Sequence, residues 1–209
     1  MLAPDPICSQ RFAWCMNMAL SLLLCDTPQN CKQNIASPTH PRAHEMAASA
    51  IAAATIRRAT TKADIKVAAP LFNNYRVFYD QEPDMSKCET FLLERLERKE
   101  SVLFVASSTT SRGDEDQKEV ATGFVHLYPM FSSVRARRTW VLNDLFVEAE
   151  FRRGGVAGSL MQAAEDFAKE HDGALIALET GEDNKQAQKL YESRGWELET
   201  GMRHYSLAL

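Results

Sequence analysis

Residues 152–158, RRGGVAG, constrain the fold most, because the spacing of the apolar residues changes from one side of them to the other. The segment before them, TWVLNDLFVEAE, has the period of two that is typical of a strand. After them, apolar residues recur at helical spacing: Val156, Leu160, Ala164, Phe167 and Ala168. The pattern predicts a strand, a glycine turn and a helix, in that order.

The rest of the chain from Thr55 onward is also periodic. The apolar segment HDGALIALET predicts a strand covered on both faces and parallel to TWVLNDLFVEAE. VLFVAS and EVATGFVHLY predict an antiparallel hairpin. Further strands are expected at TIRRA, WELE and RHYSLAL, and further helices at KADIKVAAPLFNNYRVFYD, at SKCETFLLERLERKE with Ser86 as N-cap, and at NKQAQKLYESRG. We therefore expect an α/β (α+β) protein with a mixed sheet of about six to seven strands flanked by helices.

The first 50 residues differ from the remainder in composition. The run from Phe12 to Cys25 is apolar but shorter than the roughly 20 residues that cross a bilayer. We expect 1–50 to be an N-terminal extension, flexible or weakly targeting, and 51–209 to be one folded domain. The expected location is cytoplasmic with no membrane partner, although organellar targeting by the extension stays open.

Charge and cysteine content limit the classes of function. There are 24 basic and 28 acidic residues, so the basic surplus that drives nucleic-acid binding is missing. Four of the five cysteines lie in the first 31 residues at wide spacings that match no metal-binding motif. We expect no nucleic-acid partner and no metal.

The glycine turn predicts an anion site. Glycines between a strand and a helix let backbone amides approach a phosphate at the positive end of the helix dipole. The alternative is that the Gly154–Gly155 pair only makes a tight turn. The turn matches neither a Walker loop nor the GxGxxG of dinucleotide folds, so nucleotide hydrolysis and hydride transfer are disfavoured.

Two separated motifs resemble one family. NDLFVEAEFRRGGVAGSLM followed by LETGEDNKQAQKLYESRGWE is similar to the acetyl-CoA-binding half of the GNAT N-acetyltransferases, with the closest layout in the yeast Hpa-type and the spermidine/spermine and thialysine acetyltransferases. The resemblance implies a GNAT fold in which the fourth and fifth strands separate to hold acetyl-CoA. It covers residues 55–209.

The resemblance also implies which residues hold the cofactor. The amides of the turn would bind the pyrophosphate of coenzyme A, with two arginines near its phosphates. The backbone of the fourth strand and Asn184 would contact the pantetheine arm. The implied residues are Leu145, Phe146, Val147, Arg152, Arg153, Gly154, Gly155, Val156, Ala157, Gly158 and Asn184. A plain helix N-cap is an equal alternative for Asn184.

Tyr191 is the candidate general acid. It lies seven residues after Asn184, about two helical turns, so both can face the cofactor. In the family, a free amine attacks the thioester directly and a tyrosine protonates the leaving thiolate. The alternative for Tyr191 is a core aromatic.

The base must remove a proton from an amine of pKa about 10.4. Asp144 is the leading candidate, because it is a charged residue within an apolar strand. Glu179 and His126 are further candidates for the base. The alternative for Glu179 is a side chain that only faces solvent, and the alternative for His126 is a hydrogen-bonded structural residue. Polyamine enzymes of the family carry a glutamate where this chain has Asn143, which puts polyamine specificity in doubt.

The acceptor site is the least specified. The resemblance implies an acceptor wall at the end of the first helix, which here carries Tyr75, Phe78, Tyr79 and Asp80, although these aromatics could be ordinary core. The substrate-binding candidates are Tyr79, Asn143, Asp144 and Glu179. A small amine is the expected acceptor; protein lysines or N-termini, or a non-catalytic coenzyme A-binding module, are the alternatives. The RHYSLAL strand could pair with a second copy to form a homodimer.

Overall fold

A computed structural model describes residues 54–111 and 117–209 of the chain. Of these, 54–190 form one compact unit, called the main unit below, and Tyr191–Leu209 belong to a second. The predicted extension 1–50 lies outside the described residues, as does its boundary near Ala50.

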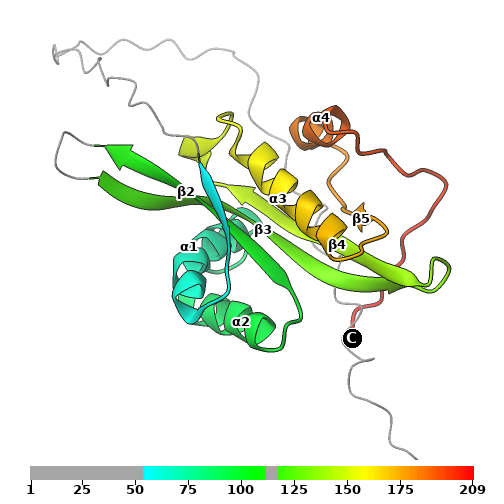
Figure 1. The fold of residues 1–209 in the computed structure, drawn as a ribbon, viewed down its shortest axis with the longest axis horizontal. Helices are drawn as coiled ribbons and strands as arrows, with labels where there is room; N and C mark the ends of the chain where they lie inside the picture. The colour runs from blue at the N-terminus through cyan, green and yellow to red at the C-terminus, as the bar shows by residue number, and fades with distance from the viewer. Residues whose placement is uncertain (1–53, 112–116) are drawn as a thin grey trace, which may run out of the picture. The chain divides into compact units, whose positions relative to one another are not determined.

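The main unit is built on one mixed sheet in the order β1-β2-β3-β4-β5 (Figure 1). Its strands are β1 (Thr55–Arg58), β2 (Val102–Ser111), β3 (Gln117–Ser132), β4 (Arg137–Val147) and β5 (Ile176–Ala177). β1 to β4 are antiparallel neighbours, whereas β5 is parallel to β4. The predicted hairpin of β2 and β3 and the parallel pairing of β5 with β4 are confirmed.

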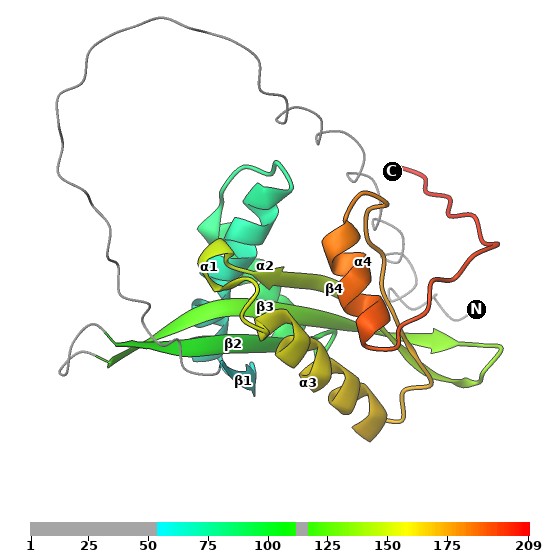
Figure 2. The same ribbon diagram turned by 90° about the horizontal axis from the view of Figure 1, so that it is seen from above.

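Helices lie on both faces of this sheet. Figure 1 shows α1 (Lys62–Phe78) and α2 (Met85–Glu97) on one face and α3 (Val156–Glu170) on the other, and Figure 2 shows β2, β3 and β4 side by side between them. A short 3-10 turn, η2 (Ala149–Phe151), connects β4 to the glycine turn, and α4 (Lys185–Ser193) follows β5. The strand–turn–helix unit predicted around residues 152–158 is therefore present.

The helix starts follow from local capping. Thr61 and Asp64 form a reciprocal capping box at α1, in which Thr61 Oγ1 accepts from the Asp64 amide and the Asp64 carboxylate accepts from the Thr61 amide. At α2 the N-cap is Asp84, whose carboxylate accepts from the Lys87 amide at 2.9 Å, so the prediction of Ser86 was wrong. Aspartate caps as well as serine, and Asp84 is fixed further by its amide, which donates to Asn73 Oδ1.

Each helical layer packs aromatic side chains against the sheet. Under α1 and α2, Phe72 stacks on Phe91 and meets Phe124 of β3 edge-on. Under α3, Phe167 packs edge-on against Phe104 of β2 and Trp140 of β4. The predicted stripe of α3 is buried throughout: Val156, Leu160, Ala164, Phe167 and Ala168.

The sheet has fewer strands than the six to seven expected. In the described residues it has five, and 196–209, which include WELE and RHYSLAL, form neither helix nor strand. Their large apolar side chains are exposed: Leu198, Met202, Tyr205, Leu207 and Leu209. Alternation alone does not make a strand, because an extended segment needs a neighbour to accept its main-chain hydrogen bonds. The predicted homodimer stays a prediction.

β5 is also shorter and less buried than expected. Only two residues pair with β4, and Ala177 is exposed, so HDGALIALET is not a strand covered on both faces. Within the described residues, no strand pairs with β5 on the side away from β4. β5 therefore lacks the second neighbouring strand that a buried parallel strand has.

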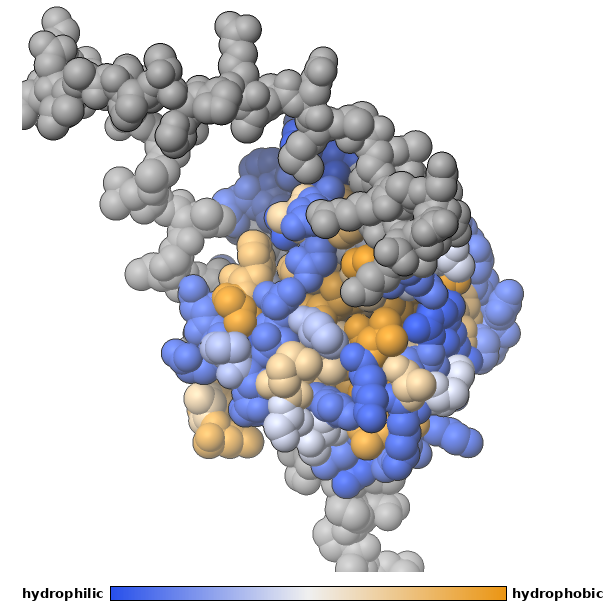
Figure 3. Space-filling view, turned by 90° about the vertical axis from the view of Figure 1, so that its left-hand side faces the viewer, coloured by the Kyte–Doolittle hydropathy of each residue, from blue (hydrophilic) through white to orange (hydrophobic). Residues whose placement is uncertain are grey.

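The surface is largely polar. On the face drawn in Figure 3, hydrophilic side chains cover most of the described surface, and apolar ones gather in smaller patches between them. None of the helices in the described residues combines the length and apolar character that crossing a bilayer requires.

Candidate active site

The turn between β4 and α3 presents unused backbone donors. Gly155 is the N-cap of α3 with φ 83°, in the left-handed region that favours glycine, and a Cβ there would meet no atom within 4 Å. No side chain of the described residues caps this helix end. The first helical bond at the turn runs from the Ser159 amide to the Gly155 carbonyl, so the amides of residues 156–158 remain available to an anion.

β4 and β5 separate beside this turn. They pair at Trp140–Ile176 and Val141–Ala177, and no strand of the described residues pairs with β4 on that side between Leu142 and Val147. The predicted separation of the two strands is therefore present. Its open edge includes Leu145, Phe146 and Val147, whose main chain was predicted to contact the pantetheine arm.

Arg152 and Arg153 leave the turn in different ways. Arg152 Nε donates to the Val147 carbonyl at 2.8 Å, and its guanidinium lies 5.9 Å from the centre of the Phe146 ring. This contact ties the turn to the end of β4. Arg153 is exposed and has a left-handed backbone, φ 63°. The proximity of both arginines to phosphate stays a prediction.

A β-bulge in β4 brings two polar residues together. His126 pairs with Asp144 and Leu127 with Leu142, so Asn143 is the extra residue on β4. Asn143 Nδ2 donates to Asp144 Oδ1 at 2.7 Å. Bulges of this kind redirect side chains and often lie next to active sites.

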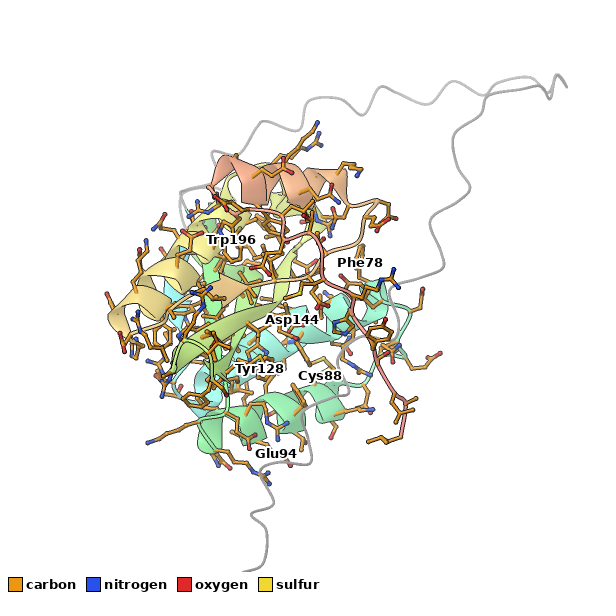
Figure 4. All side chains as sticks on the ribbon, turned by 90° about the vertical axis from the view of Figure 1, so that its right-hand side faces the viewer. Phe78, Cys88, Glu94, Tyr128, Asp144 and Trp196 are labelled. Atoms are coloured by element: carbon orange, nitrogen blue, oxygen red, sulfur yellow. The ribbon has the colours of Figure 1, made fainter. Side chains whose placement is uncertain are left out.

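Asp144 is a buried carboxylate with polar neighbours. It is 5% exposed, and Figure 4 shows it inside the molecule on the side of α1 and α2, as Tyr128 is. His126 Nδ1 lies 3.3 Å from Asp144 Oδ2, at an angle outside that of a hydrogen bond. The bond from the Asn143 amide compensates in part for the loss of water around the charge.

Three tyrosines surround this carboxylate. Burial, and next the negative charge of Asp144, raise the pKa of Tyr75 and of Tyr128 well above the usual value. Burial is also the main reason why the pKa of Tyr79 is raised. All three hydroxyls consequently keep their protons over the physiological pH range and can act as donors.

His126 has a partner on each side of its ring. Besides Asp144, it contacts Ser101 through Nε2, at 2.7 Å from Oγ. Sequence reasoning missed Ser101, and it also missed Tyr128 and the influence of Asp144 on Tyr75. The spacing of His126 and Tyr128, two apart on one strand, could have placed both on the same face of the sheet. Nothing in the sequence pairs either of them with Ser101.

The remaining predicted residues lie after β5. Asn184 Oδ1 accepts from the Ala187 amide at 3.2 Å, so Asn184 is the N-cap of α4, and its contact with the cofactor stays a prediction. Glu179 is exposed and lies two residues past β5. Tyr191 lies on α4, with its ring centre 6.1 Å from that of Trp196. It belongs to the second unit, so its role also stays a prediction.

Metal ligands do not cluster in the part of the chain that the structure describes. No group of three or more histidine, cysteine, aspartate or glutamate side chains converges there. His126 and Asp144 do lie together, but their further contacts are a serine, an asparagine and a tyrosine.

Comparison with known proteins identifies the family. Residues 69–196 match the acetyltransferase (GNAT) family. The chain is 43% identical over 152 residues to an uncharacterized N-acetyltransferase, YhfO, of Bacillus subtilis (strain 168), which covers 73% of this chain and 95% of that protein. It is also 37% identical, with a TM-score of 0.64, to a probable acetyltransferase of known crystal structure, over 74% of this chain and 97% of that one. The chain belongs to the GNAT acetyltransferase family.

A more distant structure shares the fold. AAC(6′)-Iy, in complex with the bisubstrate analogue CoA-S-monomethyl-acetylneamine, is 21% identical with a TM-score of 0.58, over 76% of this chain and 100% of that one. The protein is an N-acetyltransferase whose co-substrate is acetyl-CoA. The amides of residues 156–158, which make no helical hydrogen bond, and the open edge of β4 fit the phosphate and amide groups of that molecule.

Proposed function

We propose that this N-acetyltransferase acetylates the primary amine of a small molecule, a polyamine or an amino-acid derivative, by direct attack in a ternary complex. Acetyl-CoA supplies an acetyl group that its thioester activates toward amines. The observation that carries the proposal is the carboxylate of Asp144, buried at the bulge of β4 and hydrogen-bonded by the Asn143 amide.

The surroundings of α1 favour a cationic acceptor. Asp80, Glu82 and Asp84 are exposed in the segment that follows α1. The C-terminal end of a helix carries a partial negative charge, and it adds to the field of these carboxylates. Such a field attracts ammonium groups and raises their local concentration.

The acceptor must lose a proton before it can attack. An alkyl ammonium of pKa about 10.4 is almost fully protonated at neutral pH. In this proposal Asp144 is the base, and the amide of Asn143 keeps one carboxylate oxygen oriented. Glu179, which is exposed two residues past β5, is the reserve candidate for the base. Tyr191 is the proposed acid for the thiolate.

The coenzyme A half of the proposal uses the backbone. The amides of residues 156–158 would bind the pyrophosphate, and the main chain of Leu145 to Val147 would receive the pantetheine arm. The side chain of Asn184 would contribute if it exchanges its capping bond for one to the cofactor. The family match over residues 69–196 supports a coenzyme A site in this part of the chain.

A protein acceptor is the second candidate. Lysine side chains and N-termini carry the same ammonium chemistry, so Asp144 would serve them equally. The acidic segment 80–84 would then bind basic residues of a peptide. A non-catalytic module is disfavoured, because the family and the relatives are named as acetyltransferases.

A thiol-release assay over a panel of amines and peptides tests the proposal. We expect small di- and polyamines or amino-acid derivatives to release thiol from acetyl-CoA faster than peptides do. The Asp144→Asn variant should lower turnover about 100-fold while its calorimetric affinity for coenzyme A stays unchanged. A preference for peptides would support the second candidate, and no release with any amine would refute the function.

A further inference from the structure

A serine, a histidine and an aspartate lie in a row across the sheet. Ser101 Oγ is 2.7 Å from His126 Nε2, and His126 Nδ1 is 3.3 Å from Asp144 Oδ2. Ser101 comes directly before β2, while His126 belongs to β3 and Asp144 to β4. The proposed acetyl transfer uses neither the serine nor the histidine, so their contact needs an explanation of its own.

The register of the strands brings these three side chains together. Leu103 of β2 pairs with His126, and Ser101 lies two residues before Leu103, so the serine and the leucine lie on the same side of the sheet. His126 in turn pairs with Asp144 of β4. Residues directly opposite each other on antiparallel strands have their side chains on one face. His126 is therefore placed between the serine and the aspartate.

The aspartate decides which ring nitrogen of His126 carries the proton. Asn143 Nδ2 donates to Asp144 Oδ1 at 2.7 Å, and the other oxygen, Oδ2, is the one near His126. A carboxylate oxygen only accepts hydrogen bonds, and an unprotonated Nδ1 beside it would be a second acceptor at a place that excludes water, since the histidine is 1% and the aspartate 5% exposed. The neutral imidazole therefore has its proton on Nδ1. Its Nε2 is then an acceptor, to which the Ser101 hydroxyl donates.

This order of groups is the one that activates a serine for nucleophilic attack. The histidine takes the hydroxyl proton as the oxygen attacks, and the aspartate keeps the imidazole in the required tautomer and stabilises its charged form. The contact of Nδ1 with Asp144 is not aligned as a hydrogen bond, and such contacts are often long or poorly aligned in an enzyme without substrate. The rings of Phe72 and Tyr128, with centres 6.4 and 4.7 Å from that of His126, limit the movement of the imidazole.

Ser101 is the member of the row that a small molecule can reach. It is partly exposed, whereas the histidine and the aspartate are buried. A cavity of about 10 Å³ lies against Ser101 and His126. This is about the space that one water occupies, and a methyl group is of similar size. The other walls of the cavity are apolar: Ala59, Ile65, Leu92, Leu96 and Leu103. The cavity therefore fits the methyl group of an acetyl ester, with the alcohol part of the ester outside.

We propose that Ser101 is the nucleophile of a second activity, the cleavage of small acetyl esters, with His126 as its general base. Asp144 is a positioning residue in this activity, because it acts through the imidazole. The inference goes beyond the proposed acetyl transfer and does not rest on it. Ester cleavage needs neither coenzyme A nor an amine, and its reacting oxygen belongs to Ser101.

The steps of this reaction balance. Ser101 Oγ forms a bond to the ester carbonyl carbon while its proton passes to His126 Nε2. The bond from that carbon to the alcohol oxygen breaks, and the alcohol leaves with the proton from Nε2. A water then attacks the acetyl-serine carbon and gives one proton to Nε2. The bond from the carbon to Ser101 Oγ breaks, Oγ takes this proton back, and acetic acid leaves. The net reaction is ester and water to alcohol and acid.

An alkyl fluorophosphonate tests whether Ser101 is activated. The reagent forms a stable oxygen–phosphorus bond with an activated serine and releases fluoride, and mass spectrometry of the digested protein locates it. We expect Ser101 to be labelled in the wild type, and Asp144→Asn to slow the labelling about 100-fold, because an amide no longer holds the proton on Nδ1. Ser132→Ala is the matched control: Ser132 is also partly exposed, but its Oγ accepts from the Arg135 amide, and the variant should be labelled at the wild-type rate. An unlabelled Ser101, or labelling unchanged by Asp144→Asn, would overturn the proposal.

Two esters test the size of the cavity. The wild type should release nitrophenol from p-nitrophenyl acetate about tenfold faster than from p-nitrophenyl butyrate, because the longer acyl chain does not fit beside Ser101. The rate of Ser101→Ala is subtracted, since it measures cleavage by other groups and by water. Equal rates for the wild type and Ser101→Ala would contradict the proposal.

An NMR spectrum of the histidine side chains tests the proton position in the wild type, so it does not depend on whether any variant folds. We expect His126 to be neutral with its proton on Nδ1. A proton on Nε2 would overturn the proposal, because that nitrogen could not accept the proton of Ser101. Amine-dependent release of thiol from acetyl-CoA, measured on the same preparation, tests the proposed function separately. Its absence would refute acetyl transfer and leave ester cleavage standing, and failure of the Ser101 experiments would do the reverse.

Discussion

Gly123 of β3 lies where the backbones of two strands come closest together. A Cβ built on it would lie 2.6 Å from the Phe146 carbonyl oxygen, 3.1 Å from Val147 Cγ2 and 3.3 Å from Leu160 Cδ1. The nearest atom belongs to the backbone of β4, so it cannot move aside without shifting the strand. We expect Gly123→Ala to lower the free energy of unfolding by about 1–3 kcal/mol, the usual range for overpacking. This corresponds to a fall in Tm of about 2–12 °C for a protein of this size.

The Gly123→Ala substitution should also change the affinity for coenzyme A. Phe146 and Val147 form the proposed edge for the pantetheine arm, so a displaced β4 should also weaken coenzyme A binding measured by calorimetry. Gly154→Ala is the matched control for stability, because its nearest contact, the Phe151 carbonyl, is at an ordinary 3.5 Å. A Gly123→Ala protein whose Tm lies within 1 °C of wild type, roughly the scatter of a small ΔΔG, would refute the argument from close approach.

Three further predictions concern other elements. Burial would raise the pKa of Asp64, but bonds from Thr60, Thr61 and Arg57 lower it from 3.8 to about 2. Its stabilising contribution is therefore present above about pH 4 and is lost as the pH falls through 2, so Asp64→Asn should cost about 1 kcal/mol in urea unfolding at pH 7 and progressively less toward about pH 1. Leu160→Ala, at a fully buried position of α3, should cost about 2–5 kcal/mol in the same assay, and a smaller loss would mean that the site collapses. Tyr191→Phe should lower turnover about 100-fold with little change in coenzyme A affinity, and unaltered turnover would remove Tyr191 from the mechanism.

Local signals predicted the centre of the fold well. The change of period at residues 152–158 and the left-handed glycine at 155 depend on neighbours in sequence, so the turn and α3 could be read directly. The length of β5 and the absence of strands in 196–209 depend on which segments pair across space. Periodicity carries no information about that pairing.

The sequence predicted the candidate site only in part. Asp144 stood out because a charge within an apolar strand needs a partner, and the structure provides Asn143, Tyr75 and His126 around it. Ser101, 25 residues from His126 in sequence, could not be found because it has no local pattern. The bulge at Asn143 was also hidden, since register is set by the facing strand.

β4 contributes to both halves of the proposed site, the acceptor half and the coenzyme A half. One of its sides turns the Asp144 carboxylate toward α1, and its free edge past Val141 runs to the glycine turn. If the proposed sites are right, a change of acceptor is best sought in the segment joining α1 to α2, which leaves the proposed coenzyme A edge of β4 unaltered. An insertion or deletion within residues 142–147 would, in contrast, shift the register of β4 and so displace both Asp144 and the edge that leads to the glycine turn.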